Sequence, residues 1–327
     1  MAFSNTYDTT SPGSAALNRE DLHEAISVLA PAETPVLSSA DKFKCNATFV
    51  EWGVDKLASP ASTAVAEGAD VTDFDDKFES VARIGNYVQK LRRTFRVSDL
   101  QQAVTSVGPQ DIARAEMKAI KELKRDIEKT LLGTQDRAAE NGGGTAYTMR
   151  GLGDWLDSTG PSDVPAAYRT PANSLHLTGA FTETVMNTII TSIYRVSGVT
   201  NTLTLVADTA LRRVVTDFAR ADTTTGANRQ WNSDQSNGMI KLAVGIYQSD
   251  HGTVSLVDMN PDCSPDTTNM DEGYFLNPDY YAVGELISLG STRLPNLGGG
   301  ERGYVDWTGT LKVSHPGAHG KVTDVTQ

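Results

Sequence analysis

The sequence predicts a mixed α+β fold in which an extended, strand-rich projection precedes a long helix and a second unit of helices and strands. Three patterns indicate this arrangement. Residues 90–98 alternate between two kinds of side chain, residues 109–132 repeat apolar positions every three or four residues, and helical and strand-like segments alternate from about residue 176. With 327 residues and 39% apolar composition, the chain can build roughly two domains with a sizeable core.

The N-terminal region predicts an arm followed by a long excursion. Residues 1–40 are polar and rich in Pro, Ser and Thr, with one amphipathic patch that ends at Pro31. Residues 43–57 are strand-prone. On the return limb Leu91, Phe95 and Val97 share one side, and the residues on the opposite side are polar: Lys90, Arg92, Thr94, Arg96 and Ser98. This limb therefore predicts a half-buried strand.

Charge is sorted along this excursion. Between residues 67 and 79 one cation, Lys77, stands among six carboxylates: Glu67, Asp70, Asp73, Asp75, Asp76 and Glu79. Between residues 80 and 97 there is no carboxylate, and the cations are Arg83, Lys90, Arg92, Arg93 and Arg96. The excursion is thus an acidic bend with a basic return limb.

The excursion is too slender to be stable alone. A limb of about 18 residues reaches ~60 Å at ~3.3 Å per residue, and an isolated two-stranded ribbon is marginal in water. We expect the acidic bend to meet the basic row of a neighbouring copy, or the charged face of helix 109–132. The candidate inter-subunit contact residues are Trp52, Asp73, Asp75, Asp76, Glu79, Arg92, Arg93 and Arg96. The alternative is a floppy surface hairpin.

The clearest helix is predicted over residues 109–132, with Pro109 in its first turn and Gly133 after its end. One apolar stripe is formed by Ala113, Met117, Ile120, Leu123, Ile127 and Leu131. At 1.5 Å per residue the helix would be roughly 36 Å long. It can serve as a strut.

The second unit alternates helix and strand. A helix with Phe181, Val185, Ile189 and Ile193 ends at Gly198, and a strand, "LTLVA", and a helix with Leu211, Val215 and Phe218 follow. After a polar loop over 221–238, a strand with Ile240, Leu242, Val244 and Ile246 is joined by an "SDHG" turn to the strand "TVSLVD". The tail predicts a last strand. No repeat of 20 to 50 residues occurs.

Composition excludes several classes of protein. The net charge of −12 and the pI near 4.9 argue against a protein that grips nucleic acid, although a wall that encloses it remains open. The chain shows neither a signal peptide nor an apolar run long enough to span a membrane, and we expect a cytosolic protein. Cys45 and Cys263 lie far apart without metal-ligand spacing, which is typical of ordinary thiols.

No motif predicts a catalytic, cofactor or metal site. Gly298, Gly300 and Gly303 satisfy GxGxxG formally, but neither a strand nor a helix flanks them convincingly, so a loop is favoured. His315 and His319 are separated by Pro316 and Gly317, which prevents a helical ligand pair. The acidic run from Asp73 to Glu79 leaves a metal-assisted hydrolase as an alternative from another class.

Several stretches together carry a resemblance to a known family. They are "RIGNYVQKLRRTFRVSDLQQAV", "ARAEMKAIKELKRDIEKTLL", "RGLGDWL", "GIYQSDHGTVSLV" and "GTLKVSHPGAHG". In this order and spacing, the sequence resembles the major capsid proteins of tailed bacteriophages over nearly its whole length. The resemblance implies a Hong Kong 97-like phage capsid fold.

The resemblance also implies a division of the chain. It has an N-terminal arm (1–40), an extended β-hairpin loop (41–98), a peripheral domain (99–175) with a long spine helix (109–132), an axial domain (176–285) and a C-terminal return to the peripheral domain (286–327). About 40 residues precede the loop, so a separate scaffolding protein is expected. Lys56 and Lys77 lie in the loop, but no motif selects either for a covalent cross-link.

The implied function is structural rather than enzymatic. Hexamers and pentamers of one chain would close an icosahedral shell around double-stranded DNA without sequence-specific binding. The expected partners are further copies, a scaffolding protein, a portal and, in some heads, a decoration protein, with no membrane and no cofactor. The shell would be assembled in the host cytoplasm and remain in the virion. An encapsulin-like bacterial nanocompartment of the same fold is the alternative that sequence leaves open.

Overall fold

The computed structural model describes residues 33–62, 64–72, 74–104, 111–198, 202–218, 233–234, 239–240, 245–323 and 325–326. Most of the predicted arm lies outside these ranges. So do Asp73, Pro109, most of the polar loop 221–238 and two of the residues predicted for the following strand, Leu242 and Val244.

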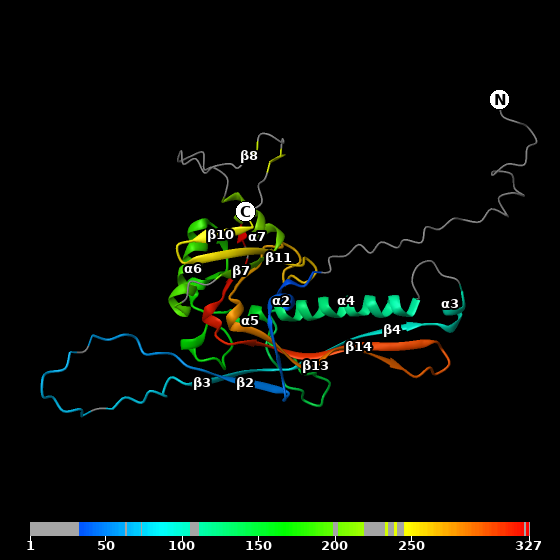
Figure 1. The fold of residues 1–327 in the computed structure, drawn as a ribbon, viewed down its shortest axis with the longest axis horizontal. Coiled ribbons are helices and arrows are strands. Elements are labelled where there is room, and N and C mark those ends of the chain that lie inside the picture. The colour runs from blue at the N-terminus through cyan, green and yellow to red at the C-terminus, as the bar shows by residue number, and fades with distance from the viewer. Residues whose placement is uncertain are drawn as a thin grey trace, which may run out of the picture.

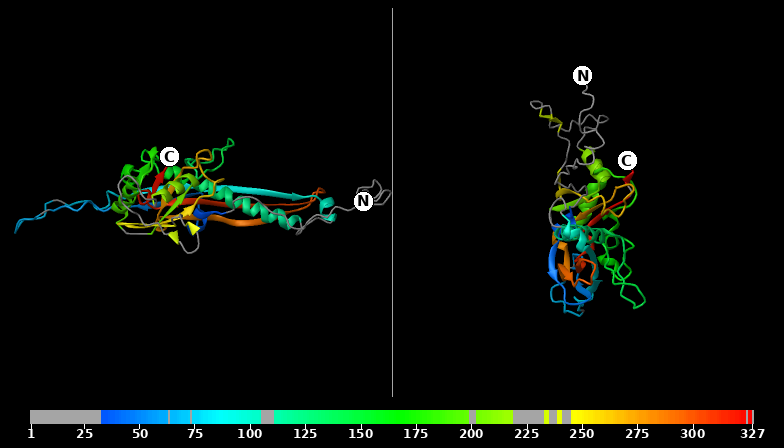
Figure 2. Two further views of the ribbon diagram at one scale, coloured as in Figure 1. Left: turned by 90° about the horizontal axis from the view of Figure 1, so that it is seen from above. Right: turned by 90° about the vertical axis from the view of Figure 1, so that its right-hand side faces the viewer.

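One half of the molecule is a four-stranded sheet with a helix along one face (Figure 1). Its strand order is β1 (Asp41–Lys44), β13 (Tyr281–Leu294), β14 (Glu301–Val313) and β4 (Gln89–Val97). Strands β13, β14 and β4 pair antiparallel, whereas β1 pairs parallel with β13. Helix α4 (Asp111–Leu132) packs on β4 and β14, and none of the described helices covers the opposite face of the sheet (Figure 2).

Helix α4 follows the predicted apolar spacing over most of its length. Ala119, Leu123, Ile127 and Leu131 are buried against the sheet. Met117, which the stripe included, is 56% exposed. At about 100° per residue it lies about 100° from the centre of these four buried residues, beyond the strip that the sheet covers. The described helix has 22 residues and is about 33 Å long.

Strand β4 pairs with another strand of the same chain, so the return limb is not part of an isolated two-stranded ribbon, contrary to what the sequence suggested. Residues 89–97 of β4 pair with residues 301–309 of β14, in a register that sets Phe95 opposite Gly303 and Leu91 opposite Trp307. Phe95 is buried, as its alternation predicts. Local sequence shows that a strand has one apolar face, but it does not show which strand pairs with it. The partner of β4 lies about 200 residues farther along the chain.

The other half is a six-stranded sheet with two helices. Its strand order is β10 (Ile246–Ser249), β11 (Gly252–Asp258), β7 (Leu203–Ala207), β12 (Gly273–Leu276), β15 (Gly320–Val322) and β5 (Leu175–His176). Helices α6 (Glu183–Ser197) and α7 (Thr209–Asp217) contribute to its core. The predicted hairpin of β10 and β11 is confirmed. Gly198 ends α6 at φ +68°, a conformation that glycine adopts without strain.

The six-stranded sheet joins the two cores, because side chains alternate across it. Leu203, Leu205 and Phe275 belong to the cluster that contains α6 and α7. Val206 and Tyr274 point the other way, into the cluster that contains α4 and the four-stranded sheet. The hydroxyl group of Tyr274 donates a hydrogen bond to the carbonyl oxygen of Leu132 at the end of α4, at 3.1 Å. The two halves therefore form one body.

Short elements complete the chain. They are α2 (Pro35–Ser39), β2 (Phe49–Val54), β3 (Ala82–Tyr87), α3 (Asp99–Ala103), α5 (Leu152–Trp155), β6 (Gly179–Ala180), β8 (Ser233–Asp234), β9 (Met239–Ile240), β16 (Val325–Thr326) and four 3₁₀ turns, Ala166–Tyr168, Ala172–Ser174, Pro278–Tyr280 and Pro316–Ala318. Residues 286–327 serve both sheets: β14 lies in the four-stranded sheet and β15 in the six-stranded one. Among the described helices, none is long and apolar enough to cross a membrane.

Candidate inter-subunit interface

The hairpin of β2 and β3 projects from one end of the body, opposite the tip of β4 and β14 (Figure 1). The two strands pair antiparallel over six residues each, with Trp52 opposite Ile84. The described residues between them, from Asp55 to Val81, form no helix or strand. We call residues 55–81 the projecting loop.

Apolar side chains on the projecting loop are exposed to solvent. The large ones are Leu57, Val65, Val71, Phe74, Phe78 and Val81. Phe74 is 87% exposed and Leu57 92% exposed. So many exposed apolar side chains on one segment are typical of a surface that another molecule covers.

The carboxylates of the projecting loop serve its local turns. Asp75 accepts a hydrogen bond from the Lys77 amine at 2.8 Å, which lowers the pKa of this aspartate. Asp76 accepts one from the backbone N–H of Phe78 at 2.9 Å, and Glu79 is exposed. Asp73 lies outside the described residues. In the described part of the chain, no group of three or more Asp, Glu, His or Cys side chains could hold a metal ion.

The root of the hairpin is fixed to the body. Asn86 is buried, and its side chain accepts a hydrogen bond from the N–H of Arg150 at 2.8 Å and donates one to the carbonyl oxygen of Leu311 at 2.9 Å. The Arg137 guanidinium donates to the carbonyl oxygen of Gly85. Trp52, predicted to contact a neighbour, is half-buried and packs on Trp155 of the same chain, with ring centroids 5.7 Å apart. The hairpin is thus anchored at its base.

Arg150 is the centre of this anchor, and sequence reasoning did not select it. Its side chain is 1% exposed and lies over the Trp155 ring at 4.7 Å. Its guanidinium contacts three carboxylates: Asp136 at 2.6 Å, Asp163 at 2.7 Å and Asp154 at 2.9 Å. Burial alone would lower the pKa of Arg150, but the hydrogen bonds to Asp163 and Asp136 outweigh it and raise the pKa. The only sequence feature that pointed to this residue was its position as the arginine of the stretch "RGLGDWL".

The three arginines of the predicted basic row do not share a face. Arg93 points to α4, where it donates two hydrogen bonds to Asp126, at 2.5 and 2.7 Å. Arg92 and Arg96 point to the opposite face, because successive side chains alternate across a strand. Arg92 lies over the Tyr304 ring at 4.7 Å, and both Arg92 and Lys90 approach Asp306, at 3.9 and 3.1 Å.

The face of the four-stranded sheet that α4 does not cover is therefore cationic. We call it the open sheet face; its side chains include Lys90, Arg92, Arg96, Arg302, Tyr304 and Asp306. Arg96 stands opposite Arg302 in the register. In the described part of the chain, neither Arg96 nor Arg302 has a carboxylate within 4.0 Å, so this end of the face has unneutralised charge.

A comparison with protein families decides the identity of the chain. The family model described as "SU10 major capsid protein" matches residues 3–326. The chain belongs to this family. As a member of a family of major capsid proteins, it is a structural subunit of a virion shell.

A curated relative of this SU10-family capsid protein is the major capsid protein of Escherichia phage Phieco32. The two are 37% identical over 114 residues, which is 34% of this chain and 32% of the relative. The aligned part thus spans about a third of the relative's length.

Solved capsid structures share the fold. The capsid of a native GTA particle aligns with a TM-score of 0.65 at 13% identity, covering 98% of this chain and 99% of the other. The capsid of cyanophage A-1(L) aligns with a TM-score of 0.65 at 16% identity, again over 98% and 99%. An encapsulin from Synechococcus elongatus aligns with a TM-score of 0.59 at 12% identity over 99% and 98%. These alignments confirm the predicted capsid fold and are consistent with its Hong Kong 97-like type.

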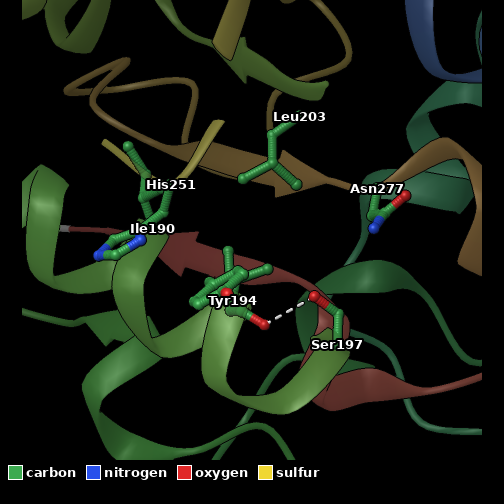
Figure 3. Close-up of a pocket in the computed structure, with 7 residues that line it drawn as sticks. Ile190, Tyr194, Ser197, Leu203, His251 and Asn277 are labelled. Atoms are coloured by element: carbon green, nitrogen blue, oxygen red, sulfur yellow. Dashed lines mark hydrogen bonds between the residues drawn. The ribbon is translucent and has the colours of Figure 1, made fainter. Parts of the chain in front are cut away.

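One pocket of this capsid protein, enclosed by the second unit, is too small for an organic ligand (Figure 3). It lies between α6, β7 and the turn before β11, where the Tyr194 and His251 rings stack 4.9 Å apart. Its volume of about 10 Å³ compares with roughly 300 Å³ or more for a small-molecule site. The Ser197 hydroxyl at its rim donates to the carbonyl oxygen of Ile193 at 2.9 Å.

The glycines and histidines considered from the sequence as possible ligand-binding residues lie in loops, strands and packed positions of the fold. Gly298 and Gly300 lie in the connection between antiparallel strands β13 and β14, and Gly303 lies inside β14, so the strand and helix of a dinucleotide site do not flank them. His319 is buried and accepts a hydrogen bond from the N–H of Asn277 at 3.1 Å. Burial lowers its pKa to about 4. His315 packs edge-on against Tyr168.

Proposed function

We propose that the chain is the major capsid subunit of a tailed phage and assembles when the projecting loop of one copy lies on the open sheet face of the next. The observation that carries this proposal is complementary charge on two distant surfaces. The loop bears Asp75, Asp76 and Glu79 beside exposed Phe74 and Phe78, and the open sheet face bears unneutralised cations. Complementary charge sets register and partner more than raw affinity.

A contact between two different surfaces is heterologous, and such contacts close into rings when the rotation between copies allows it. The proposal is therefore that rings of six and five copies close an icosahedral shell around double-stranded DNA, assembled in the host cytoplasm. A separate scaffolding protein, a portal and a decoration protein are further proposed partners. We assign the chain no catalytic activity of its own.

Within this proposal the chain divides as the resemblance implies. Residues 1–40 form the arm, 41–98 the extended loop, 99–175 the peripheral domain, 176–285 the axial domain and 286–327 the C-terminal return. The pairing of β4 with β14 supports a narrower extended loop, of residues 49–87, because residues 89–97 belong to the peripheral sheet.

A bacterial nanocompartment is a second candidate, supported by the similarity to the encapsulin from Synechococcus elongatus. The phage function is favoured because the family match covers residues 3–326. Purified shells separate the two: a nanocompartment contains a protein cargo, whereas a phage head is filled with DNA through a portal.

The assembly proposal is tested by reversing charge on the open sheet face. Arg92→Glu/Arg96→Glu should remain folded, because both side chains are exposed, but should form no closed particles. Arg92→Lys/Arg96→Lys keeps the charge and should assemble. Electron microscopy and analytical ultracentrifugation, with the scaffolding protein present, measure the outcome. Normal yields of particles from the Glu variant would refute the proposed contact.

A further inference from the structure

Helix α4 carries a second cationic surface, on the side that faces away from the sheet. Its side chains are Lys118, Lys121, Lys124 and Lys129, which we call the α4 lysine face. All four are exposed. At 100° per residue they fall within about 140° of one another around the helix, mostly on the side away from the buried stripe. Glu128 falls in the same sector, but it is buried under α2, where it accepts hydrogen bonds from the N–H groups of Val36 and Leu37.

The acidic residues of α4 do not neutralise this face. Glu116 pairs with Arg293 at 3.5 Å, and Asp126 pairs with Arg93, so both carboxylates point to the sheet. Glu122 lies 3.9 Å from Lys118, a weak contact between exposed groups. Among the described residues, no carboxylate lies within 4.0 Å of the amines of the other three lysines. A chain of net charge −12 thus leaves a strip of positive charge uncovered.

The α4 lysine face differs from the projecting loop in lacking apolar contacts. Met117 is the only large apolar side chain on the described part of α4 that is exposed. Surfaces that dock proteins combine apolar and polar groups, whereas sequence-independent binding of DNA phosphates needs cations alone. The lysines span about 16 Å along the helix, a length of duplex that carries about ten phosphates.

We propose that the α4 lysine face contacts the phosphates of the enclosed double-stranded DNA, and that this side of the subunit lines the inside of the shell. The inference rests on the proposed function. It adds which residues contact the DNA and which side of the subunit faces the inside of the shell. Four lysines in each subunit give a weak, salt-dependent contact, and the acidic remainder of the wall repels the duplex. The DNA is thus held against the wall without being fixed to it.

The test compares the full chain with two charge-matched variants. Lys121→Gln/Lys124→Gln removes two charges from the α4 lysine face, and Lys42→Gln/Lys44→Gln removes two exposed charges from β1. Binding of unassembled subunits to a 24-base-pair duplex is measured over a range of salt concentrations. We expect the slope of log K against log salt to fall by about 2 for the α4 variant and by less than half that for the β1 variant.

A second measurement fixes the orientation. In closed shells, Lys121 and Lys124 should be protected from an amine reagent too large to cross the wall, and should react once the shells are dissociated. Equal slopes for the two variants, or labelling of both lysines from outside, would overturn the inference. Failure of the α4 variant alone to form shells would also overturn it, because the face would then bind protein. Failure of the unmodified chain to form shells would instead contradict the proposed function.

Discussion

Glu128 is a buried charged side chain that ties the end of the arm to α4. Its two carboxylate oxygens accept hydrogen bonds from the backbone N–H groups of Val36 and Leu37, both at 2.8 Å. Burial nevertheless raises the pKa of Glu128 to about 7, and these two hydrogen bonds only partly oppose it. The Glu128 side chain thus binds the first turn of α2, and its burial makes the ionised form less favourable.

This geometry predicts a pH dependence of stability. Between pH 4.5 and about 7 the folded chain keeps a proton on Glu128 that the unfolded chain has lost, so the contribution of this group to stability is full below pH 4.5 and falls as pH rises through 7. The fall amounts to about 3 kcal/mol. Urea unfolding of unassembled protein at pH 5 and pH 8 should show it, and Glu128→Gln should lack that component. Equal pH dependence in both proteins would refute the assignment.

Buried and exposed arginines should differ in what their loss costs. Arg150→Ala leaves Asp136, Asp154 and Asp163 without their common partner, and we expect a loss of about 3–5 kcal/mol of unfolding free energy. Arg93→Ala breaks a partly exposed pair with Asp126, which should cost less than about 1 kcal/mol. Denaturant unfolding of both variants measures the difference. Similar losses of unfolding free energy in the two variants would show that the Arg150 cluster stabilises the fold no more than an exposed ion pair does.

At the scale of elements, the four-stranded sheet depends on close contacts between β4 and its neighbours. Gly303 on β14 faces the Phe95 ring of β4, and a Cβ atom there would lie 2.5 Å from that ring and 2.8 Å from the carbonyl oxygen of Thr292. Strand β4 thus packs closely because its partner strand presents a glycine at this point. The same strand pair supports both the α4 side and the open sheet face.

Gly303→Ala should therefore destabilise the sheet. Overpacking of this kind costs typically 1–3 kcal/mol, so the thermal midpoint should fall by several degrees. Gly299→Ala, in the β13–β14 connection, is the control, because a Cβ atom there would meet nothing within 4 Å. Scanning calorimetry compares the two. If both variants melt like the unmodified protein, the Phe95–Gly303 contact does not constrain the sheet.

At the scale of the whole molecule, the two parts of the hairpin differ: its base is bonded to the body, and its loop is exposed. Asn86, Arg137 and Arg150 hold its base, and the apolar side chains of the projecting loop are exposed to solvent. The two halves of the body share one core through the six-stranded sheet, so the body gives the loop a fixed direction.

Limited proteolysis should therefore report assembly. Trypsin should cut after Lys56 and Lys77 rapidly in unassembled subunits, because both lysines are exposed in the projecting loop. In closed shells, a neighbouring copy covers the loop, and cleavage should slow at least tenfold. Mass spectrometry of the fragments locates the cuts. Equally fast cleavage at both sites in intact shells would contradict the proposed docking of the loop.

The sequence by itself determined the local elements of this protein. Helices α4, α6 and α7 and the hairpin of β10 and β11 lie where periodicity and turn residues predicted them, because these signals act over a few residues. Alternation also assigned Phe95 to the buried side of β4. The order of charges along the excursion, acidic and then basic, is a property of sequence alone.

Only the tertiary structure decided which surfaces remain free. The partner of β4 comes from about 200 residues away, and that pairing, with α4 covering one side, sets Arg93 beside Asp126 of α4 and leaves Arg92 and Arg96 on the open sheet face. The same long-range packing buries Glu128 and Arg150 and half-buries Trp52, none of which the local pattern marks as covered. A period of two or 3.6 residues tells which side chains share a face, but burial depends on what covers that face, and distant parts of the chain supply the cover.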